Sequence, residues 1–158
     1  MLAVVRIVAI DLNMQIIKSI ITNEKELDEL RLFLKSYALP YSDLKLKDSY
    51  YLLYRDEDHA IIGSIGLEFY GTSALLRSLA VDENHRGQGV GRELVKALLF
   101  ENNKKMHAVY LLTETAHAFF LQEGFVDVDR ASVPELMQRA SEFTHTCSAS
   151  ANCMQHKM

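Results

Sequence analysis

The order of apolar and polar positions predicts a strand followed by a helix at the start of the chain. Apolar residues dominate the run from Met14 to Ile21, which is typical of a strand. Leucines then recur at helical spacing up to Pro40, and Thr22 or Asn23 can cap the first backbone N–H groups of that helix. A short helical turn is expected over residues 41–46.

Three consecutive strands follow, joined by tight turns. Residues 49–55 and 60–70 are rich in β-branched and aromatic side chains, and the acidic turn at 56–58 between them predicts a β-hairpin. A second turn at residues 71–73 leads into a strand over residues 74–81. Because such short turns join neighbouring strands that run in opposite directions, we expect three antiparallel strands.

The second half of the chain alternates helices with strands. A helix over residues 89–103 places Val90, Leu94 and Leu98 on one face, and the apolar run 107–112 predicts a buried strand. The remaining expected elements are a helix at 116–122 ending at Gly124, a strand at 125–128, a helix at 134–140 and a final strand at 142–145. The whole order predicts an α/β (α+β) domain with a mixed, mostly antiparallel sheet and helices on both faces.

Length and charge narrow the class of protein. The chain has 158 residues, 49% of them apolar, which fits one domain over residues 14–158 with residues 1–13 as an added strand, an extension or a leader. The net charge of -4, without a basic cluster, argues against nucleic acid as a partner. Neither a secretory signal nor a run near the roughly 18 apolar residues of a membrane span is present, so we expect a cytoplasmic protein. The apolar N-terminal segment could pair with a second copy in a homodimer.

The most informative motif lies between the strand at 74–81 and the helix at 89–103: Arg86-Gly87-Gln88-Gly89-Val90-Gly91-Arg92. The first N–H groups of a helix have no partners within the helix, and the helix dipole adds partial positive charge there. Glycines let a ligand approach the backbone, and the flanking arginines add charge-assisted hydrogen bonds. The pattern favours a phosphate or pyrophosphate site over a plain connecting turn.

Two other phosphate-binding motifs fit this loop less well. A dinucleotide fold places its glycines after the first strand of a parallel βαβ unit, with no antiparallel hairpins before it. A P-loop needs Gly-Lys followed by Ser or Thr, which this loop lacks. The position of the loop behind three antiparallel strands therefore favours a different phosphate-bearing ligand.

Motifs on both sides of the loop resemble those of a known family. Arg86-x-x-Gly89-x-Gly91 after Leu79-Ala80-Val81 resembles the acetyl-CoA signature of the GCN5-related N-acetyltransferases (GNAT), and Tyr110-Leu111-Leu112-Thr113 with Ala118-Phe119-Phe120-x-x-x-Gly124-Phe125 resembles that family's second cofactor segment. The resemblance covers residues 15–154 and implies a splayed strand pair that receives the pantetheine arm of acetyl-CoA, the expected co-substrate. The cofactor-binding residues that it implies are Leu79, Ala80, Val81, Arg86, Gly87, Gln88, Gly89, Val90, Gly91, Arg92, Thr113, Phe119 and Phe120.

The resemblance also implies direct acetyl transfer to an amine. The thioester carbonyl would lie beside the Leu79 backbone, where an N–H could stabilise the oxyanion. The family's usual acid is a tyrosine at the position of Phe120, so here another group serves or the thiolate leaves unassisted.

Glu68 is the first candidate for the base that deprotonates the incoming ammonium. It shares a strand face with Tyr70, and burial in a cleft would raise its pKa; the alternative is a solvent-facing carboxylate. Glu114 and His117 are weaker candidates near the second cofactor segment, where each is more typical of a surface position.

Arg77 lies in a largely apolar strand and therefore needs a partner. It could clamp a substrate carboxylate with its bidentate fork, or it could form a structural salt bridge with a hairpin carboxylate such as Glu68. Either way we expect a small amino-acid-like substrate rather than a protein lysine. The expected substrate-binding residues are Glu68, Tyr70, Arg77 and Ser78.

A finer resemblance concerns the arsenic-resistance-associated and amino-acid-type subgroup of the same family. It rests on Leu39-Pro40-x-x-Asp43-Leu44, Gly66-Leu67-Glu68-x-Tyr70-Gly71, Leu76-Arg77-Ser78-Leu79 and the tail Cys147-x-Ala149-Ser150-Ala151-x-Cys153-Met154. In such tails a proline usually follows the first cysteine, whereas this chain has Ser148. The subgroup implies arsenic resistance and an arsenical amino acid as one class of acceptor.

Cys147 and Cys153, with His145 and His156 nearby, could bind a soft metal or trivalent arsenic; the alternative is a pair of ordinary tail cysteines, and we expect no resident metal. The leading hypothesis is therefore an acetyl-CoA-dependent N-acetyltransferase of a small amine. The alternatives are a non-catalytic acetyl-CoA-binding protein and a thiol-based metalloid-binding protein on the same scaffold.

Overall fold

Eight strands form one mixed sheet in the computed structural model, which describes residues 6–11, 14–146 and 149–158. The strand order is β1-β2-β3-β4-β5-β6-β8-β7; β5 pairs with β6 in parallel, and the other neighbours are antiparallel. The expected mixed, mostly antiparallel sheet is thus confirmed. The strands are β1 (Arg6–Asp11), β2 (Met14–Ile20), β3 (Ser49–Arg55), β4 (Ile61–Tyr70), β5 (Ser73–Val81), β6 (Ala108–Thr113), β7 (Val126–Asp127) and β8 (Asn152–Lys157).

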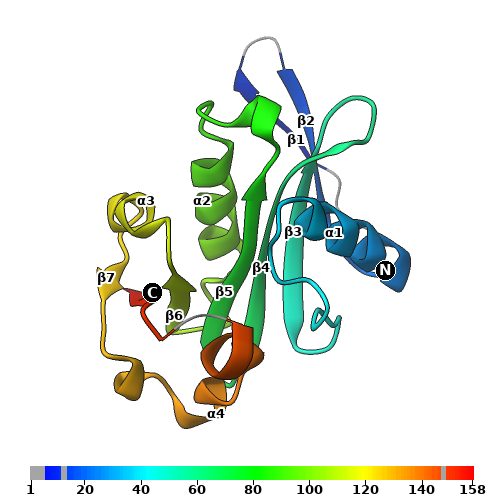
Figure 1. Ribbon diagram of the computed structural model, residues 1–158. Coiled ribbons are helices and arrows are strands. Elements are labelled where there is room, and N and C mark those ends of the chain that lie inside the picture. The colour runs from blue at the N-terminus through cyan, green and yellow to red at the C-terminus, as the bar shows by residue number, and fades with distance from the viewer. Residues whose placement is uncertain (1–5, 12–13, 147–148) are drawn as a thin grey trace.

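Helices cover both faces of this sheet, as expected (Figure 1). They are α1 (Glu24–Ser36), α2 (Val90–Asn102), α3 (His117–Gln122) and α4 (Glu135–Gln138), with the 3-10 turns η1 (Glu83–His85) and η2 (Arg130–Ser132) and the π-helical turn η3 (Glu142–Thr146). Neighbouring residues of β3 separate the two layers: Tyr51 and Leu53 pack with the leucines of α1, whereas Leu52 and Tyr54 pack with α2. This alternation explains why the centre of β3 is buried throughout.

α1 begins where its sequence signals place it. The Asn23 side chain accepts the backbone N–H of Glu26 at 2.9 Å, and Glu24 and Glu26 occupy the first turn beside the positive end of the helix dipole. The helix ends at Ser36, ahead of Pro40. Residues 41–46 form turns and not the short helical turn expected from the sequence.

The C-terminal segment differs from its expected structure. Residues 142–145 belong to the π-helical turn η3 and not to a strand, because the backbone N–H groups of Phe143 and Thr144 donate to the Ala140 carbonyl at 3.0 and 3.2 Å. The last strand is instead β8, which pairs antiparallel with β6 over the whole of β6. In the fold of the tail, β8 separates β6 from the two-residue strand β7.

The N-terminal residues 6–11 form β1, which pairs antiparallel with β2 at one edge of the sheet. Of the structures expected for residues 1–13, the added strand therefore matches the described part. Residues 1–5 and 12–13 lie outside the described residues, and the division of the chain at residue 14 stays a prediction.

Two irregularities in β5 create the site. Opposite β4, Gly66 pairs with Arg77 while Ser64 pairs with Ala80, so β5 carries one residue more than its partner and bulges at Ser78–Leu79. Ser78 adopts a left-handed conformation with φ 60°, which few non-glycine residues do. On its other side β5 pairs with β6 only over Ser73–Leu75. Beyond that point the two parallel strands diverge.

Candidate functional site

A cleft of about 960 Å³ occupies the gap between β5 and β6, within the size range of small-molecule sites. Its walls come from both layers of the fold. Leu76, Leu111 and Phe120 belong to the core on the α2 side of the sheet. Asp43, Arg77, Ser141 and Glu142 line the cleft at the end covered by α4 and η3, which lie over the lower ends of β4 and β5 in Figure 1. Residues from both helical layers therefore line the cleft.

The glycine loop precedes α2, at the far end of β5 from the turn with β4. Gly87 and Gly89 have φ of 75° and 85°, a left-handed conformation that favours glycine, and a Cβ at either position would have no atom within 4 Å. Gly89 caps α2 without a side-chain hydrogen bond, and the first helical bond runs from Glu93 N–H to the Gly89 carbonyl at 3.0 Å. Among the described residues, no capping side chain accepts the N–H groups ahead of Glu93, and this geometry fits a pyrophosphate.

The two arginines of the loop make different contacts. Arg86 donates from Nε to the Val81 carbonyl at 3.0 Å and lies over the Tyr37 ring, 5.1 Å from its centroid. Arg92 lies 3.4 Å from Glu123 of the turn after α3, and its side chain is 61% exposed. Arg86 therefore supports the loop backbone from the side, while the exposed guanidinium of Arg92 can reach an anion at the helix start.

The second cofactor segment packs against the first. The Phe119 ring lies 3.7 Å from the place that a Gly91 Cβ would occupy, so α3 approaches α2 where Gly91 leaves room. Phe120 is buried and packs edge-on against Phe119 and Phe125. Thr113 accepts the backbone N–H of Ala116 at 2.9 Å. Phe120 and Thr113 line the cleft, and Phe120 offers no proton to a leaving thiolate.

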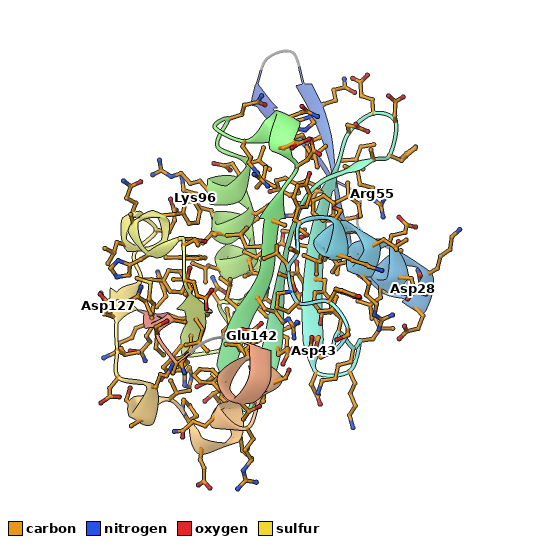
Figure 2. All side chains as sticks on the ribbon, viewed as in Figure 1. Asp28, Asp43, Arg55, Lys96, Asp127 and Glu142 are labelled. Carbon is orange, nitrogen blue, oxygen red and sulfur yellow. The ribbon has the colours of Figure 1, made fainter. Side chains whose placement is uncertain are left out.

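Arg77 is the centre of a buried ion cluster, which we call the Arg77 cluster (Asp43, Glu68, Arg77 and Glu142; Figure 2 labels Asp43 and Glu142). Its guanidinium donates to both oxygens of Asp43 at 2.7 Å and to Glu68 at 2.5 Å, and its Nε lies 3.5 Å from Glu142. The side chain is 1% exposed. The salt-bridge alternative is thus present. Three N–H groups of this guanidinium donate to Asp43 and Glu68, and its Nε donates to the Ser78 hydroxyl at 3.3 Å, so most of its donors are already in use.

Charge and burial set the protonation of this cluster. Hydrogen bonds from Arg77 lower the pKa of Asp43 to about 2. Burial raises the pKa of Glu142 to about 7, against the opposing effect of the Arg77 charge. Burial alone would lower the pKa of Arg77, but its carboxylate partners raise it above its usual value. Three carboxylates against one guanidinium leave the cluster with a net negative charge.

Glu68 and Tyr70 share a strand face, as expected from alternation. The Tyr70 hydroxyl donates to Glu68 Oε2 at 2.8 Å, and the other oxygen of Glu68 accepts from Arg77. Glu68 is therefore buried and not solvent-facing, but both of its oxygens are occupied and it does not line the cleft. Of the expected substrate-binding residues, Arg77 and Ser78 line the cleft, and Glu68 and Tyr70 lie behind Arg77.

The structure also gives the positions of the two weaker base candidates and of one cysteine. Glu114 lines the cleft, whereas His117 forms an exposed pair with Asp127 at 2.8 Å. Cys153 is buried and free, and Cys147 lies outside the described residues. Within the described part of the chain, no group of three or more potential metal ligands comes together.

The structure adds three residues that the sequence reasoning missed: Asp43, Ser141 and Glu142. Ser141 donates to Asp43 at 2.5 Å, which ties the segment before η3 to the loop after α1. Asp43 was visible only as part of a family motif. Glu142 is not indicated by the sequence, which predicts a strand over residues 142–145 and gives no sign that this segment lies beside Arg77.

Solved structures similar to this chain share its fold. A GNAT acetyltransferase from Staphylococcus aureus Mu50 is 18% identical with a TM-score of 0.65, over 89% of this chain and 98% of that one. A Mycobacterium tuberculosis protein solved with CoA is 17% identical with a TM-score of 0.69, over 88% and 98%. N-acetylglutamate synthase from Neisseria gonorrhoeae, solved with CoA and N-acetyl-glutamate, is 13% identical with a TM-score of 0.68 over 89% of this chain, which spans 35% of that protein.

A family model decides the assignment. The model described as an acetyltransferase (GNAT) domain matches residues 47–127, just over half of the chain. The match runs from the loop before β3 to β7 and so includes the bulged strand β5, the glycine loop and α3. The chain therefore belongs to the GNAT family of acetyltransferases, enzymes whose co-substrate is acetyl-CoA.

Proposed function

We propose that this protein transfers the acetyl group of acetyl-CoA directly to the amine of a small molecule, in the cleft between β5 and β6. The observation that carries the proposal is the divergence of β5 from β6 beyond Leu75 and Tyr110. A parallel pair that stays closed would bury its backbone hydrogen bonds, whereas this pair leaves an edge of β5 open beside a cleft. An extended ligand arm can pair with such an edge.

The donor side of the proposed site is the side of α2. The loop from Arg86 to Arg92 would hold the pyrophosphate, with Gly87, Gln88, Gly89, Val90 and Gly91 offering backbone N–H groups. Leu79, Ala80 and Val81 of β5 and Thr113, Phe119 and Phe120 would line the path of the pantetheine arm. When bound, acetyl-CoA supplies a thioester whose acetyl carbon an amine can attack. Leu79 lies in the bulge and lines the cleft, and its N–H would stabilise negative charge on the carbonyl oxygen.

The departing thiolate needs no strong acid in this proposal. Phe120 lies where the resemblance places a tyrosine, and its ring has no proton to give. A thiol is a fairly strong acid, with a pKa of about 8.5 for the cysteine side chain, so a thiolate can leave without being protonated first. Bulk water can protonate it after release.

The class of acceptor follows from the Arg77 cluster. An amino-acid-like acceptor, including an arsenical amino acid, is the prediction from the subgroup resemblance and from the presence of Arg77, whether that residue clamps a substrate carboxylate or forms a structural salt bridge. Since Asp43, Glu68 and Glu142 already surround that guanidinium, a substrate carboxylate would be the fourth at this site and would be repelled by their negative charge. We therefore propose an acceptor whose amine has no carboxylate on the neighbouring carbon.

The test measures CoA release with matched acceptors: amino acids, arsenical amino acids, and the decarboxylated amine of each amino acid. We expect release with amines, at least about tenfold faster in kcat/KM for a decarboxylated amine than for its parent amino acid, which is about 1.4 kcal/mol of discrimination. A preference for the amino acids would contradict the proposed acceptor and favour the amino-acid-type subgroup. CoA binding without release with any amine would contradict the enzyme and favour a non-catalytic binding protein.

Three further expectations stay predictions. No described helix is long and apolar enough to cross a bilayer, and the cytoplasmic location is expected from the sequence alone. The homodimer through the N-terminal segment and the binding of metalloids by Cys147 and Cys153 are likewise expected from the sequence alone. Arsenite-loaded protein, assayed for bound arsenic against a double Cys→Ser variant, tests the last of these.

A further inference from the structure

The three carboxylates around Arg77 differ in how fully their oxygens are used. Asp43 accepts from both terminal nitrogens of Arg77 and from Ser141. Glu68 accepts from Arg77 and from Tyr70. Among the residues that the structure describes, Glu142 has a single partner, the Arg77 Nε at the longer distance of 3.5 Å. Glu142 is thus the carboxylate of the cluster with unused hydrogen-bonding capacity.

Glu142 lines the cleft, so its unused hydrogen-bonding capacity is available to a ligand there. Its side chain is only 8% exposed, yet it lines the cleft together with Asp43 and Ser141, whereas Glu68 does not. A buried carboxylate without a full set of hydrogen bonds is costly unless a ligand or water completes them. η3 delivers Glu142 at the end of the cleft that lies opposite the layer of α2 and the glycine loop.

We infer that Glu142 takes the proton of the acceptor's ammonium group, an assignment that rests on the proposed acetyl transfer. Asp43 and Ser141 hold the entrance of this subsite, and Glu68 with Tyr70 keeps Arg77 in place behind it. A donor entering from the side of α2 and an acceptor entering from the side of η3 would meet in the gap between β5 and β6. The subsite takes a primary ammonium group, which matches both the charge of the cluster and the reaction.

Electrostatics fits this role. Burial raises the pKa of Glu142 to about 7, while the Arg77 charge lowers it and the Glu68 and Asp43 charges raise it further. Tyr70 and Tyr51 are further titratable groups near the cluster. Burial raises the pKa of both, and the bond to Glu68 raises that of Tyr70 as well, so both stay neutral. A base with a pKa near the working pH combines a deprotonated form with adequate strength. Asp43, with a pKa of about 2, is too weak a base to share the role.

In the proposed reaction the acceptor nitrogen loses two protons and gains the acetyl group. The Glu142 carboxylate removes one proton from R–NH₃⁺, and the amine lone pair then forms the C–N bond to the acetyl carbon. The C–S bond breaks, and its electron pair leaves on the CoA sulfur. The second proton lost by the nitrogen goes to water or to that thiolate, and Glu142 returns its own proton to solvent through the open end of the cleft.

The decisive experiment compares pH profiles of kcat/KM for the native protein and Glu142→Gln. Glu142 must be deprotonated to act, so the native activity should fall about tenfold per pH unit below about 7. The glutamine variant should lose about 100-fold or more in kcat and lack that limb, while CoA affinity and thermal unfolding stay near native values. Glu142→Asp should retain the limb with partial activity. The ammonium of the acceptor titrates at higher pH and affects all variants alike.

Two control variants distinguish loss of the base from other effects of removing a glutamate. Glu135→Gln changes an exposed glutamate of α4 that pairs with Arg139, and it should leave the profile unchanged. Glu68→Gln should lower stability or acceptor affinity and keep the acid limb, moved to lower pH, because it removes a negative charge that raises the pKa of Glu142 without removing the base. A Glu142→Gln variant that keeps the limb, or a Glu68→Gln variant that loses it, would overturn the assignment. Inactivity of the native protein toward every amine would instead overturn the proposed function itself.

Discussion

Replacing Gly89 by glutamate should weaken CoA binding about 100-fold or more, a loss of about 2.7 kcal/mol. Gly89 has φ 85° at the cap of α2, where a side chain strains the backbone and where the first N–H groups of the helix are open. A carboxylate at this point would compete for those N–H groups and repel the pyrophosphate. Calorimetric titration with CoA measures the change directly.

Gly71→Glu is the matched control for this variant. Gly71 also has a left-handed φ, of 65°, and no atom lies within 4 Å of its would-be Cβ, so the backbone strain is comparable. It lies in the turn between β4 and β5, away from the glycine loop. We expect Gly71→Glu to lower stability to a similar extent and to keep CoA affinity. Equal loss of affinity in both variants would show that strain, and not the anion site, explains the effect.

Replacing Arg77 by methionine should lower the free energy of unfolding by about 3–5 kcal/mol, because it leaves buried carboxylates without their counter-ion. Asp43, Glu68 and Glu142 all depend on this guanidinium, whose side chain is 1% exposed. The same change should abolish turnover, because it disorders the acceptor end of the cleft. Urea denaturation near neutral pH measures the stability.

A second variant keeps this expectation falsifiable where the first fails to fold. Adding Asp43→Asn and Glu68→Gln to Arg77→Met removes two of the unpaired charges and should recover part of the lost stability. Arg139→Met, which breaks an exposed pair with Glu135, should cost no more than about 0.5 kcal/mol. If Arg77→Met cost no more than this surface control, the ion cluster would not stabilise the fold.

Much of this fold could be predicted because its local signals agree with its tertiary packing. The strand at 49–55, the helix after Asn23 and the helix after Gly89 all occur where periodicity and capping residues indicate them. The segment 142–145 differs from its expected structure because four residues with a single apolar side chain, Phe143, show no periodicity that would distinguish a strand from a helical turn. Its backbone N–H groups donate to the Ala140 carbonyl, and no pattern in the sequence indicates these hydrogen bonds.

The candidate site was predictable on its donor side and not on its acceptor side. The glycine loop is contiguous, and its chemistry follows from the start of a helix. The Arg77 cluster instead joins residues from the loop after α1, from β4, from β5 and from η3. The charges of this cluster disfavour a substrate carboxylate at Arg77, and they leave Glu142 as the carboxylate available to the acceptor. The bulge at Ser78 is equally invisible, since serine does not signal a left-handed φ.

A crystal structure with CoA and an acceptor amine tests the central claim most directly. We expect the pyrophosphate on the N–H groups at the start of α2, the sulfur in the gap between β5 and β6 beside Leu79, and the acceptor nitrogen within hydrogen-bond distance of Glu142. A coenzyme whose sulfur lies outside that gap, or an acceptor nitrogen that contacts Glu68 and not Glu142, would contradict the account.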